Sequence, residues 1–256
     1  FTIRPAQGRP FASPHLARRL LTNSNKPTIQ STVDLKLQRI LEKSLTSYRE
    51  RRGDVGIANA SALLIDHRSM EVLAYLGSAD FWDTKIHGQV DGIKMRRSPG
   101  STLKPFIYAL ALQQGLIHPH SLLKDAKRNF GEYKPENFDR GYSGPLSATQ
   151  ALQRSRNVPA VALTSLLKRP RFYEFLKRAE IQLPKEASHY GLTLALGGAE
   201  VSLEELVRLY AVLPNGGKLR PLVFEAETPA APVKPILSPE AAFLTLTTVS
   251  YTHLRA

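Results

Sequence analysis

A serine and a lysine three residues apart, Ser101 and Lys104, are the pair in this sequence best suited to covalent catalysis. A serine hydroxyl is a weak nucleophile at neutral pH, so it needs a nearby base and donors that stabilise the developing negative charge. A lysine removed from water can act as that base, because burial lowers its pKa toward neutrality. On a helix this spacing puts both side chains on one face. The pair therefore predicts acyl chemistry on Ser101.

The residues around this pair predict a buried helix that begins close to Ser101. Pro99-Gly100 forms the predicted entering loop, and Pro105 is tolerated only in or near the first turn of a helix. Residues 106–112 are apolar on all sides, which is typical of a helix in the middle of a domain. Ser101 would then lie at the positive end of the helix, where backbone amides supply part of an anion site. The alternative is an ordinary helix cap with a surface lysine.

The S-x-x-K spacing alone is weak evidence, because it occurs two more times in the chain. Neither of these copies follows a Pro-Gly loop. We predict that their lysines are solvated ends of helix turns without a catalytic role. The two pairs are Ser121 with Lys124 and Ser165 with Lys168.

A second polar cluster, Ser155-Arg156-Asn157, is the only S-x-N in the sequence. A hydroxyl and an amide two residues apart can face one cleft from a tight bend between helices. The hydroxyl could relay a proton between a lysine and a leaving group, and the amide could hold a substrate carbonyl and bond the lysine. Ordinary capping at a helix terminus is the alternative interpretation of this cluster.

Composition limits the function classes. A length of 256 residues suffices for one large domain or two small ones, and the net charge of +13 is high. The basic residues are scattered and lack the patterns of nucleic-acid binding motifs.

The absence of cysteine excludes disulfides, thiolate metal sites and cysteine nucleophiles. No apolar run approaches the ~18 residues of a membrane span. The chain opens at Phe1, so we expect a piece of a longer protein.

Apolar periodicity and capping residues predict the elements that position these motifs. Asp34 caps a predicted helix through Tyr48, and residues 62–65 and 71–76 form a predicted hairpin covered on both faces. The apolar side of the helix that Asp34 caps would comprise Leu35, Leu37, Ile40, Leu41 and Leu45. Further helices are predicted to begin near Ser147, Val158, Arg171, Ser202 and Pro239. Residues 127–144 form a predicted ordered loop over a cleft. Helices mixed with a few adjacent strands predict an α+β domain with a mostly antiparallel sheet.

Taken together, these segments resemble the transpeptidase domain of the bifunctional (class A) penicillin-binding proteins. Serine acyl enzymes of this kind use an S-x-x-K motif, an S-x-N or S-D-N motif and a K-T-G motif. The resemblance extends over about residues 12–248 and rests on several blocks of the sequence. These are residues 32–38, 65–78, 97–106, 133–139, 144–147, 155–161 and 196–201.

The resemblance implies a fold and a set of residue roles. The fold would be α+β and serine β-lactamase/DD-transpeptidase-like, with an antiparallel sheet flanked by helices and incomplete at the C-terminus. Ser101 would be the nucleophile and Lys104 its base, with Ser155 as proton relay and Asn157 orienting the substrate. The implied substrate-binding residues are Gly100, Thr102, Gly197 and Gly198. No metal and no cofactor are implied.

Two departures from the family pattern shape the expected domain organisation. The sequence contains no K-[ST]-G, and residues 249–256 do not continue the family pattern. We therefore expect residues 1–30 to be a connector from a preceding glycosyltransferase domain that is absent here. Residues 31–248 would be a partial transpeptidase domain, and residues 249–256 a non-family tail. Because the missing motif would complete the oxyanion hole, we expect this fragment to be inactive or nearly so.

The implied function is that of a peptidoglycan D,D-transpeptidase, which cross-links stem peptides through a serine acyl-enzyme and is inhibited by β-lactam antibiotics. The intact protein would work at the periplasmic face of the bacterial inner membrane, held by an N-terminal anchor outside this sequence, and would bind no nucleic acid. One alternative is a D,D-carboxypeptidase or β-lactamase of the same fold. A second is a non-catalytic module that binds an anionic polymer through the +13 charge.

Overall fold

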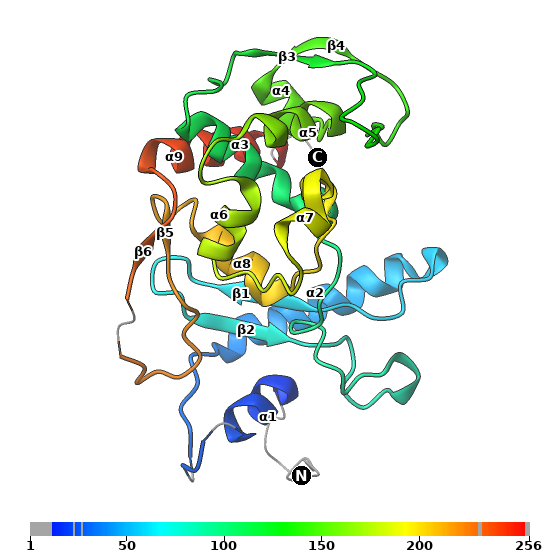
Figure 1. Ribbon diagram of the computed structural model, residues 1–256. Helices are drawn as coiled ribbons and strands as arrows, with labels where there is room; N and C mark the ends of the chain where they lie inside the picture. Colours follow the sequence, from blue (N-terminus) through cyan, green and yellow to red (C-terminus); the bar gives the residue numbers. More distant parts are fainter. Residues whose placement is uncertain (1–11, 23, 27, 230–231, 254–256) are drawn as a thin grey trace. The chain divides into compact units, whose positions relative to one another are not determined.

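The computed structural model describes residues 12–22, 24–26, 28–229 and 232–253 (Figure 1). The chain divides into two compact units, and neither unit is continuous in sequence. The first comprises residues 1–95, 202–208 and 220–232, and the second comprises residues 96–201, 209–219 and 233–256. Residues 1–11, 23 and 27 of the predicted connector and residues 254–256 of the predicted tail lie outside the described residues.

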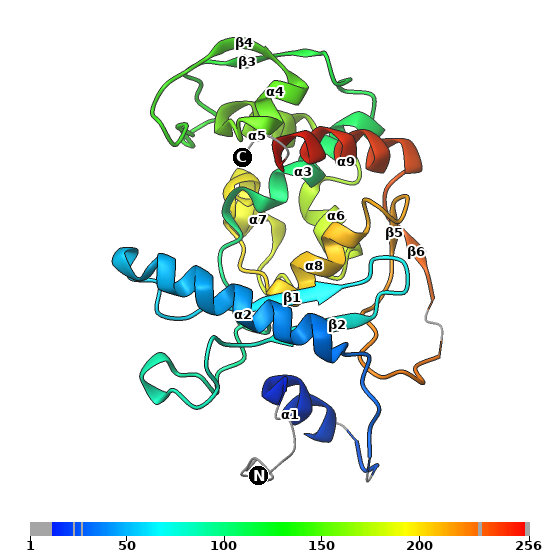
Figure 2. The same ribbon diagram turned by 180° about the vertical axis from the view of Figure 1, so that it is seen from behind.

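The first unit is built on the predicted hairpin. Strands β1 (Ala62–Ile65) and β2 (Val72–Leu76) pair antiparallel, and helix α2 (Leu35–Arg51) lies along the hairpin (Figure 2). Helix α1 (Pro14–Thr22) precedes the hairpin in the chain. The core joins Leu16, Tyr75 and Ile93 to apolar side chains from residues 203–224. Two 3₁₀ turns, η1 (Gly53–Val55) and η2 (Thr84–Ile86), complete this unit.

Helix α2 docks on β2 through a glutamine. The Asp34 carboxylate caps the helix as predicted, accepting from the backbone N–H groups of Lys36 and Leu37. Gln38 is fully buried, and its side-chain amide pairs with the backbone N–H and C=O of Tyr75 at 2.8 and 3.3 Å. The predicted apolar side is only partly right, because Leu35 and Ile40 are about half exposed. Polar pairing to a strand backbone thus fixes α2, a role that helical periodicity does not reveal.

The second unit surrounds one apolar helix, α3 (Lys104–Gln113). Every residue of α3 from Lys104 to Ala111 is buried. It packs against α9 (Pro239–His253), α5 (Asn157–Leu166) and α4 (Ala148–Gln153) (Figure 1). This confirms the prediction that the helix after Ser101 lies inside a domain. The unit also contains α6 (Phe172–Arg178), α7 (Ala187–Tyr190), and the 3₁₀ segments η3 (Gly100–Leu103) and η4 (Gly191–Leu196).

Predicted caps are present at two helix starts. Ser147 and Gln150 form a reciprocal capping box at α4. Ser202 and Glu205 exchange the same pair of contacts at the start of α8 (Leu203–Ala211). Each box satisfies backbone N–H groups that the first helical turn leaves without partners.

The described strands form three separate two-stranded antiparallel sheets. The α+β class and antiparallel pairing are confirmed, but the expected single sheet is not what the described residues show.

The sequence patterns did not predict β3 (Leu122–Asp125), which pairs with β4 (Gly144–Ser147). Lys124 therefore lies on a strand, so its predicted place in a helix turn was wrong. Strand β5 (Lys218–Leu219) pairs antiparallel with β6 (Lys234–Pro235).

Among the described residues, no helix combines the length and apolar character that crossing a bilayer requires.

Candidate active site

The serine and lysine of the first motif sit at the start of the buried helix. Residues Gly100–Leu103 form a 3₁₀ turn that runs directly into α3, and Pro105 lies in the first turn of that helix. The Lys104 backbone N–H donates to the Ser101 carbonyl within this turn. Ser101 is exposed, whereas the Lys104 side chain is buried. The predicted helix start is therefore confirmed, and its first turn is wound more tightly than an α-helix.

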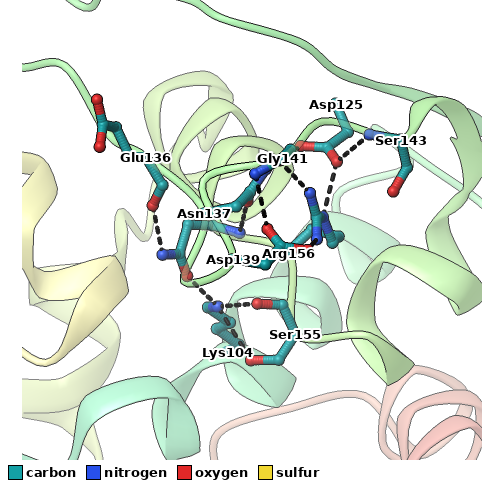
Figure 3. A network of polar contacts seen from close by, with 10 residues as sticks. Lys104, Asp125, Glu136, Asn137, Asp139, Gly141, Ser143, Ser155 and Arg156 are labelled. Carbon is teal, nitrogen blue, oxygen red and sulfur yellow. Dashed lines mark hydrogen bonds and ion pairs between the residues drawn. The ribbon is translucent and has the colours of Figure 1, made fainter.

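Lys104 is the centre of the polar cluster. Its Nζ donates to the Ser155 carbonyl at 2.5 Å, to Ser155 Oγ at 3.1 Å and to Asn157 Oδ1 at 2.6 Å (Figure 3). The residue is only 1% exposed. The structure thus brings together three of the four predicted catalytic residues around one ammonium group.

Burial, together with the smaller effect of the nearby positive charge of Arg156, lowers the pKa of Lys104 to about 8. Both causes disfavour the ammonium form, one through lost solvation and the other through repulsion. An ordinary lysine is almost entirely protonated at neutral pH, so it cannot accept a proton. A lysine with a pKa near 8 has an appreciable neutral fraction and can act as a base.

The three hydrogen-bond partners of Lys104 differ in whether they can donate as well as accept. The Ser155 carbonyl and Asn157 Oδ1 only accept hydrogen bonds, so they hold two N–H groups in either protonation state. The Ser155 hydroxyl can accept or donate. When Lys104 loses a proton, its lone pair can therefore face a hydroxyl without breaking the other two bonds. This arrangement fits a proton relay between Lys104 and a serine.

Ser155 adopts a left-handed backbone conformation, with φ of +52°. It follows the end of α4, where its N–H donates to the Leu152 carbonyl and the Arg156 N–H donates to the Ala151 carbonyl. This pair of bonds is a Schellman motif, whose left-handed position is usually glycine. A serine at this position carries a steric cost that glycine would avoid. The bend is what directs both the carbonyl and the hydroxyl of Ser155 toward Lys104.

Asn157 is held in place by the loop before the second motif. Its Nδ2 donates to the Glu136 carbonyl at 2.6 Å, and its backbone N–H donates to Asn137 Oδ1 at 2.8 Å. Because Nδ2 is occupied by a carbonyl, Oδ1 must face the lysine. Asn137 is itself buried and donates through Nδ2 to Asp125 Oδ1 and to the Gly141 carbonyl, both at 2.8 Å. The predicted ordered loop thus positions the amide of Asn157.

Arg156 anchors the other side of the same loop. Its Nε donates to Asp125 Oδ2 at 2.7 Å, its Nη1 donates to Asp139 Oδ2 at 2.8 Å, and its Nη2 donates to the Gly141 carbonyl (Figure 3). Asp125 is fully buried and also accepts from the Ser143 backbone N–H at 2.9 Å. Burial opposes the charge of Arg156, but the hydrogen bonds to Asp139 and Asp125 outweigh it and raise its pKa.

The sequence reasoning missed this buried ion pair. Arg156 occupies the variable position of the S-x-N motif, and Asp125 lies 31 residues earlier on β3. The sequence feature that could have pointed to partners of Arg156 was the polar block at residues 133–139, which contains Asn137 and Asp139. Nothing in its spacing shows that the block closes on Arg156.

Gly197 packs directly against the loop that carries Ser101. Its φ is +89°, and a Cβ there would lie 2.4 Å from the Gly100 backbone nitrogen. The Ser98 hydroxyl donates to the Gly197 carbonyl at 2.8 Å. Gly198 is tight against Thr193 instead, with a Cβ position 2.3 Å from its hydroxyl oxygen. These contacts give Gly197 a packing role at the loop, while substrate contacts of either glycine stay a prediction.

Gly100 and Thr102 complete the turn. Gly100 has φ of +54°, which favours glycine, and the Thr102 hydroxyl donates to the Pro99 carbonyl at 2.7 Å. The Tyr210 hydroxyl donates to the Thr102 carbonyl at 2.7 Å, which fixes the turn from outside. Among the residues that the structure describes, no hydrogen bond joins Ser101 Oγ to Lys104 Nζ. The predicted nucleophile and the predicted base are thus neighbours on one turn, and the side chain of the predicted base is bonded to Ser155 and Asn157 of the second motif.

Sequence comparisons identify the class of protein to which this fold and this cluster belong. The family of the penicillin binding protein transpeptidase domain matches residues 60–249. The chain belongs to this family.

Individual relatives give a finer comparison. The chain is 38% identical to penicillin-binding protein 1C of Escherichia coli (strain K12), covering 92% of the chain and 30% of that relative. The motif blocks described above also resemble this type within the class A group. Identity to penicillin-binding protein 1F of Bacillus subtilis (strain 168) is 33%, over 70% of the chain and 24% of the relative. The chain thus spans about a quarter to a third of the length of these curated relatives.

Solved structures confirm the fold class. A structure titled as a peptidoglycan glycosyltransferase from Burkholderia ambifaria matches with a TM-score of 0.72 at 20% identity, over 85% of this chain and 72% of that chain. The transpeptidase domain of penicillin-binding protein 3 from Burkholderia pseudomallei matches with a TM-score of 0.71 at 21% identity, over 88% and 70%. The serine β-lactamase/transpeptidase-like fold expected from the motifs is therefore confirmed.

Proposed function

We propose that this chain is the acylating part of a peptidoglycan D,D-transpeptidase with Ser101 as nucleophile. The observation that carries the proposal is the Lys104 amine. It is buried, its pKa is lowered to about 8, and it is bonded to Ser155 and Asn157 three residues after an exposed serine. Family membership supports the same chemistry.

In the proposed acylation, Ser101 Oγ attacks the carbonyl carbon between the two terminal D-alanines of a stem peptide. Lys104 takes the hydroxyl proton. The tetrahedral intermediate collapses, the C–N bond breaks, and D-alanine leaves with a proton that Lys104 returns through Ser155. The product is an ester between Ser101 and the shortened peptide. The Ser101 backbone N–H is one donor to the oxyanion, and loss of such a donor costs about 10²–10³ in rate.

In the proposed second step, an amine of a neighbouring stem peptide attacks this ester. Lys104 and Ser155 accept the amine proton and return a proton to Ser101 Oγ. A new peptide bond forms and the serine is regenerated. Asn157 holds the backbone of the donor peptide, with Gly100, Thr102, Gly197 and Gly198 at the rim of the site.

The proposed partners follow from this reaction. They are peptidoglycan stem peptides as substrates and β-lactam antibiotics as acylating inhibitors. The proposed place of action is the periplasmic face of the bacterial inner membrane. The names of the relatives reported above, which are penicillin-binding proteins, support the proposed β-lactam partners.

A fluorescent penicillin tests the nucleophile on the natural protein that contains this chain. We expect one covalent adduct per chain, mapped to Ser101 by peptide mass spectrometry and abolished in Ser101→Ala. Ser121→Ala and Ser165→Ala are matched controls, because both serines precede a lysine with the same spacing. Labelling that persists in Ser101→Ala would overturn the assignment.

Product analysis separates transfer from hydrolysis. With a stem peptide donor and an acceptor amine, we expect cross-linked product to exceed free shortened peptide. Release of free peptide alone would instead identify a carboxypeptidase of the same fold.

A further inference from the structure

A basic cleft lies in the first unit, and its lining contains no residue of the candidate active site. It has a volume of about 190 Å³ and lies between α1 and the segment around residues 89–94. Its lining includes His15, Arg18, Arg19, Gln89, Asp91 and Lys94. A space of this size can hold an ion with several oxygens together with its ordered water.

Two of the charged groups in this lining are already engaged by the protein. Arg19 forms a two-point ion pair with Glu204, with N···O distances of 2.6 and 3.1 Å. Asp91 accepts from the Tyr75 hydroxyl at 2.6 Å through one oxygen and from the Ile93 N–H at 3.1 Å through the other. Both Asp91 oxygens therefore accept from neutral protein donors, and the carboxylate keeps its negative charge, so a bound anion must lie on the Arg18 and Lys94 side of the cleft.

Three other groups keep donor capacity for a ligand. The described residues provide no acidic partner for Arg18 or for Lys94. Arg18 instead lies over the Phe81 ring, 5.0 Å from its centroid, and donates to the backbone and side-chain oxygens of Gln89. Because the side-chain oxygen of Gln89 accepts from Arg18, its amide N–H₂ points elsewhere and can donate. The guanidinium is thus held in position by neutral groups while its charge is not cancelled.

We propose that this cleft binds a phosphate-class oxyanion, such as a phosphate monoester or diester. The Arg18 guanidinium would provide paired N–H donors, Lys94 a mobile point charge, and Gln89 a neutral donor. Phosphate fits better than a single carboxylate because three donors from two chain segments, α1 and residues 89–94, line the cleft. The site is independent of the proposed transpeptidase reaction, since none of its residues contributes to the cluster around Lys104.

Inorganic phosphate and pyrophosphate are the first probes, titrated against the natural protein by calorimetry at low ionic strength. We expect saturable binding that weakens as salt is added. The double variant Arg18→Gln/Lys94→Gln should bind at least tenfold more weakly. Lys43→Gln/Arg52→Gln is the matched control, because it removes two exposed cations from α2 and its C-cap. An equal loss in the control pair, or unchanged binding in the cleft variant, would refute the site.

Further binding experiments identify the source and the chemical class of the anion. Glycerol phosphate tests a soluble ester, and vesicles containing an anionic phospholipid test a lipid headgroup; loss of either interaction in the cleft variant supports the site. Tighter binding of succinate than of phosphate would overturn the phosphate assignment. Penicillin labelling of Ser101 and the thermal midpoint should be unchanged in the cleft variant. Failure of the transpeptidase proposal would therefore be visible separately.

Discussion

At the scale of single residues, the protonation state of Lys104 decides the proposed chemistry. Its pKa of about 8 lies below the ordinary lysine value, so the neutral base is the minor form at pH 7 and the major form above pH 8. The same shift means that the buried ammonium costs stability below pH 8. That cost is relieved as pH rises toward the unfolded-state pKa of about 10.4.

We predict that the rate of Ser101 acylation by a penicillin rises with pH and levels off above about pH 8. The slope should be close to one decade per pH unit below that value, because one proton must leave Lys104. Stopped-flow or quenched labelling from pH 6 to 9.5 measures the profile. Lys104→Arg should abolish acylation, because arginine stays protonated. A flat profile would exclude Lys104 as the base.

Ser155 combines a useful hydroxyl with an unfavourable backbone. Its φ of +52° is a conformation that glycine adopts freely. We predict that Ser155→Gly keeps the free energy of unfolding within about 1 kcal/mol of the parent while lowering acylation by a factor of about 10² or more.

Ser155→Thr is the complementary variant. It keeps a hydroxyl but adds a β-branch, which the left-handed conformation accommodates poorly. A loss of more than about 1 kcal/mol is expected, measured by chemical denaturation. If both variants were equally stable, the backbone would not be the strained feature that the structure indicates.

At the scale of elements, the buried ion pair between Asp125 on β3 and Arg156 at the start of α5 holds the loop of residues 127–144. The Asp125 carboxylate is fully buried, whereas the Asp139 side chain is 60% exposed. Removing one partner of a buried pair leaves an uncompensated charge, which costs about 3–5 kcal/mol. Exposed pairs contribute about 0–1 kcal/mol.

We therefore predict that Asp125→Asn destabilises the protein by about 3 kcal/mol or more, while Asp139→Asn has a much smaller effect. Both substitutions remove one negative charge that faces Arg156, so each variant serves as a control for the other. Urea denaturation gives the two free energies of unfolding. Similar values for the two variants would show that burial of Asp125 is not what matters.

The contact between η4 and the Ser101 loop gives a second test at this scale. Gly197→Ala would place a Cβ 2.4 Å from the Gly100 nitrogen, so the loop must move. Gly216→Ala is the matched control, because its φ of +60° imposes similar backbone strain with nothing within 4 Å. We predict that both lose about 1–2 kcal/mol from backbone strain. Only Gly197→Ala should also lose penicillin labelling.

The sequence predicted the helix start at Ser101, the cap at Asp34 and the hairpin, because each depends on residues close together in the chain. It also selected Lys104, Ser155 and Asn157, which the structure joins by direct bonds. It did not predict β3 or the Asp125–Arg156 pair, whose partners are separated by a long loop. Nor could periodicity show that Gln38, and not Leu35 or Ile40, is the buried residue of α2.

At the scale of the whole molecule, the first unit depends on three separate stretches of chain. Its core places Leu16, Tyr75 and Ile93 with Leu203, Leu222 and Phe224. A single cut therefore cannot release this unit intact.

We predict that a fragment ending at residue 95 lacks cooperative thermal unfolding, because it loses the apolar side chains of residues 202–208 and 220–232. Circular dichroism and calorimetry on residues 12–95 measure this. Adding a peptide that spans residues 202–232 should restore part of the structure. A sharp transition in the fragment alone would contradict the shared core.

This shared core also has a consequence during biosynthesis. Ile93 leaves the ribosome long before Phe224 is made, and at about 5–20 residues per second the interval is roughly 7–26 s. Throughout that interval the nascent hairpin exposes apolar side chains that nothing yet covers. Chaperone holdases would be expected to engage it there, and codon changes that slow translation between the two positions should lower the yield of native protein.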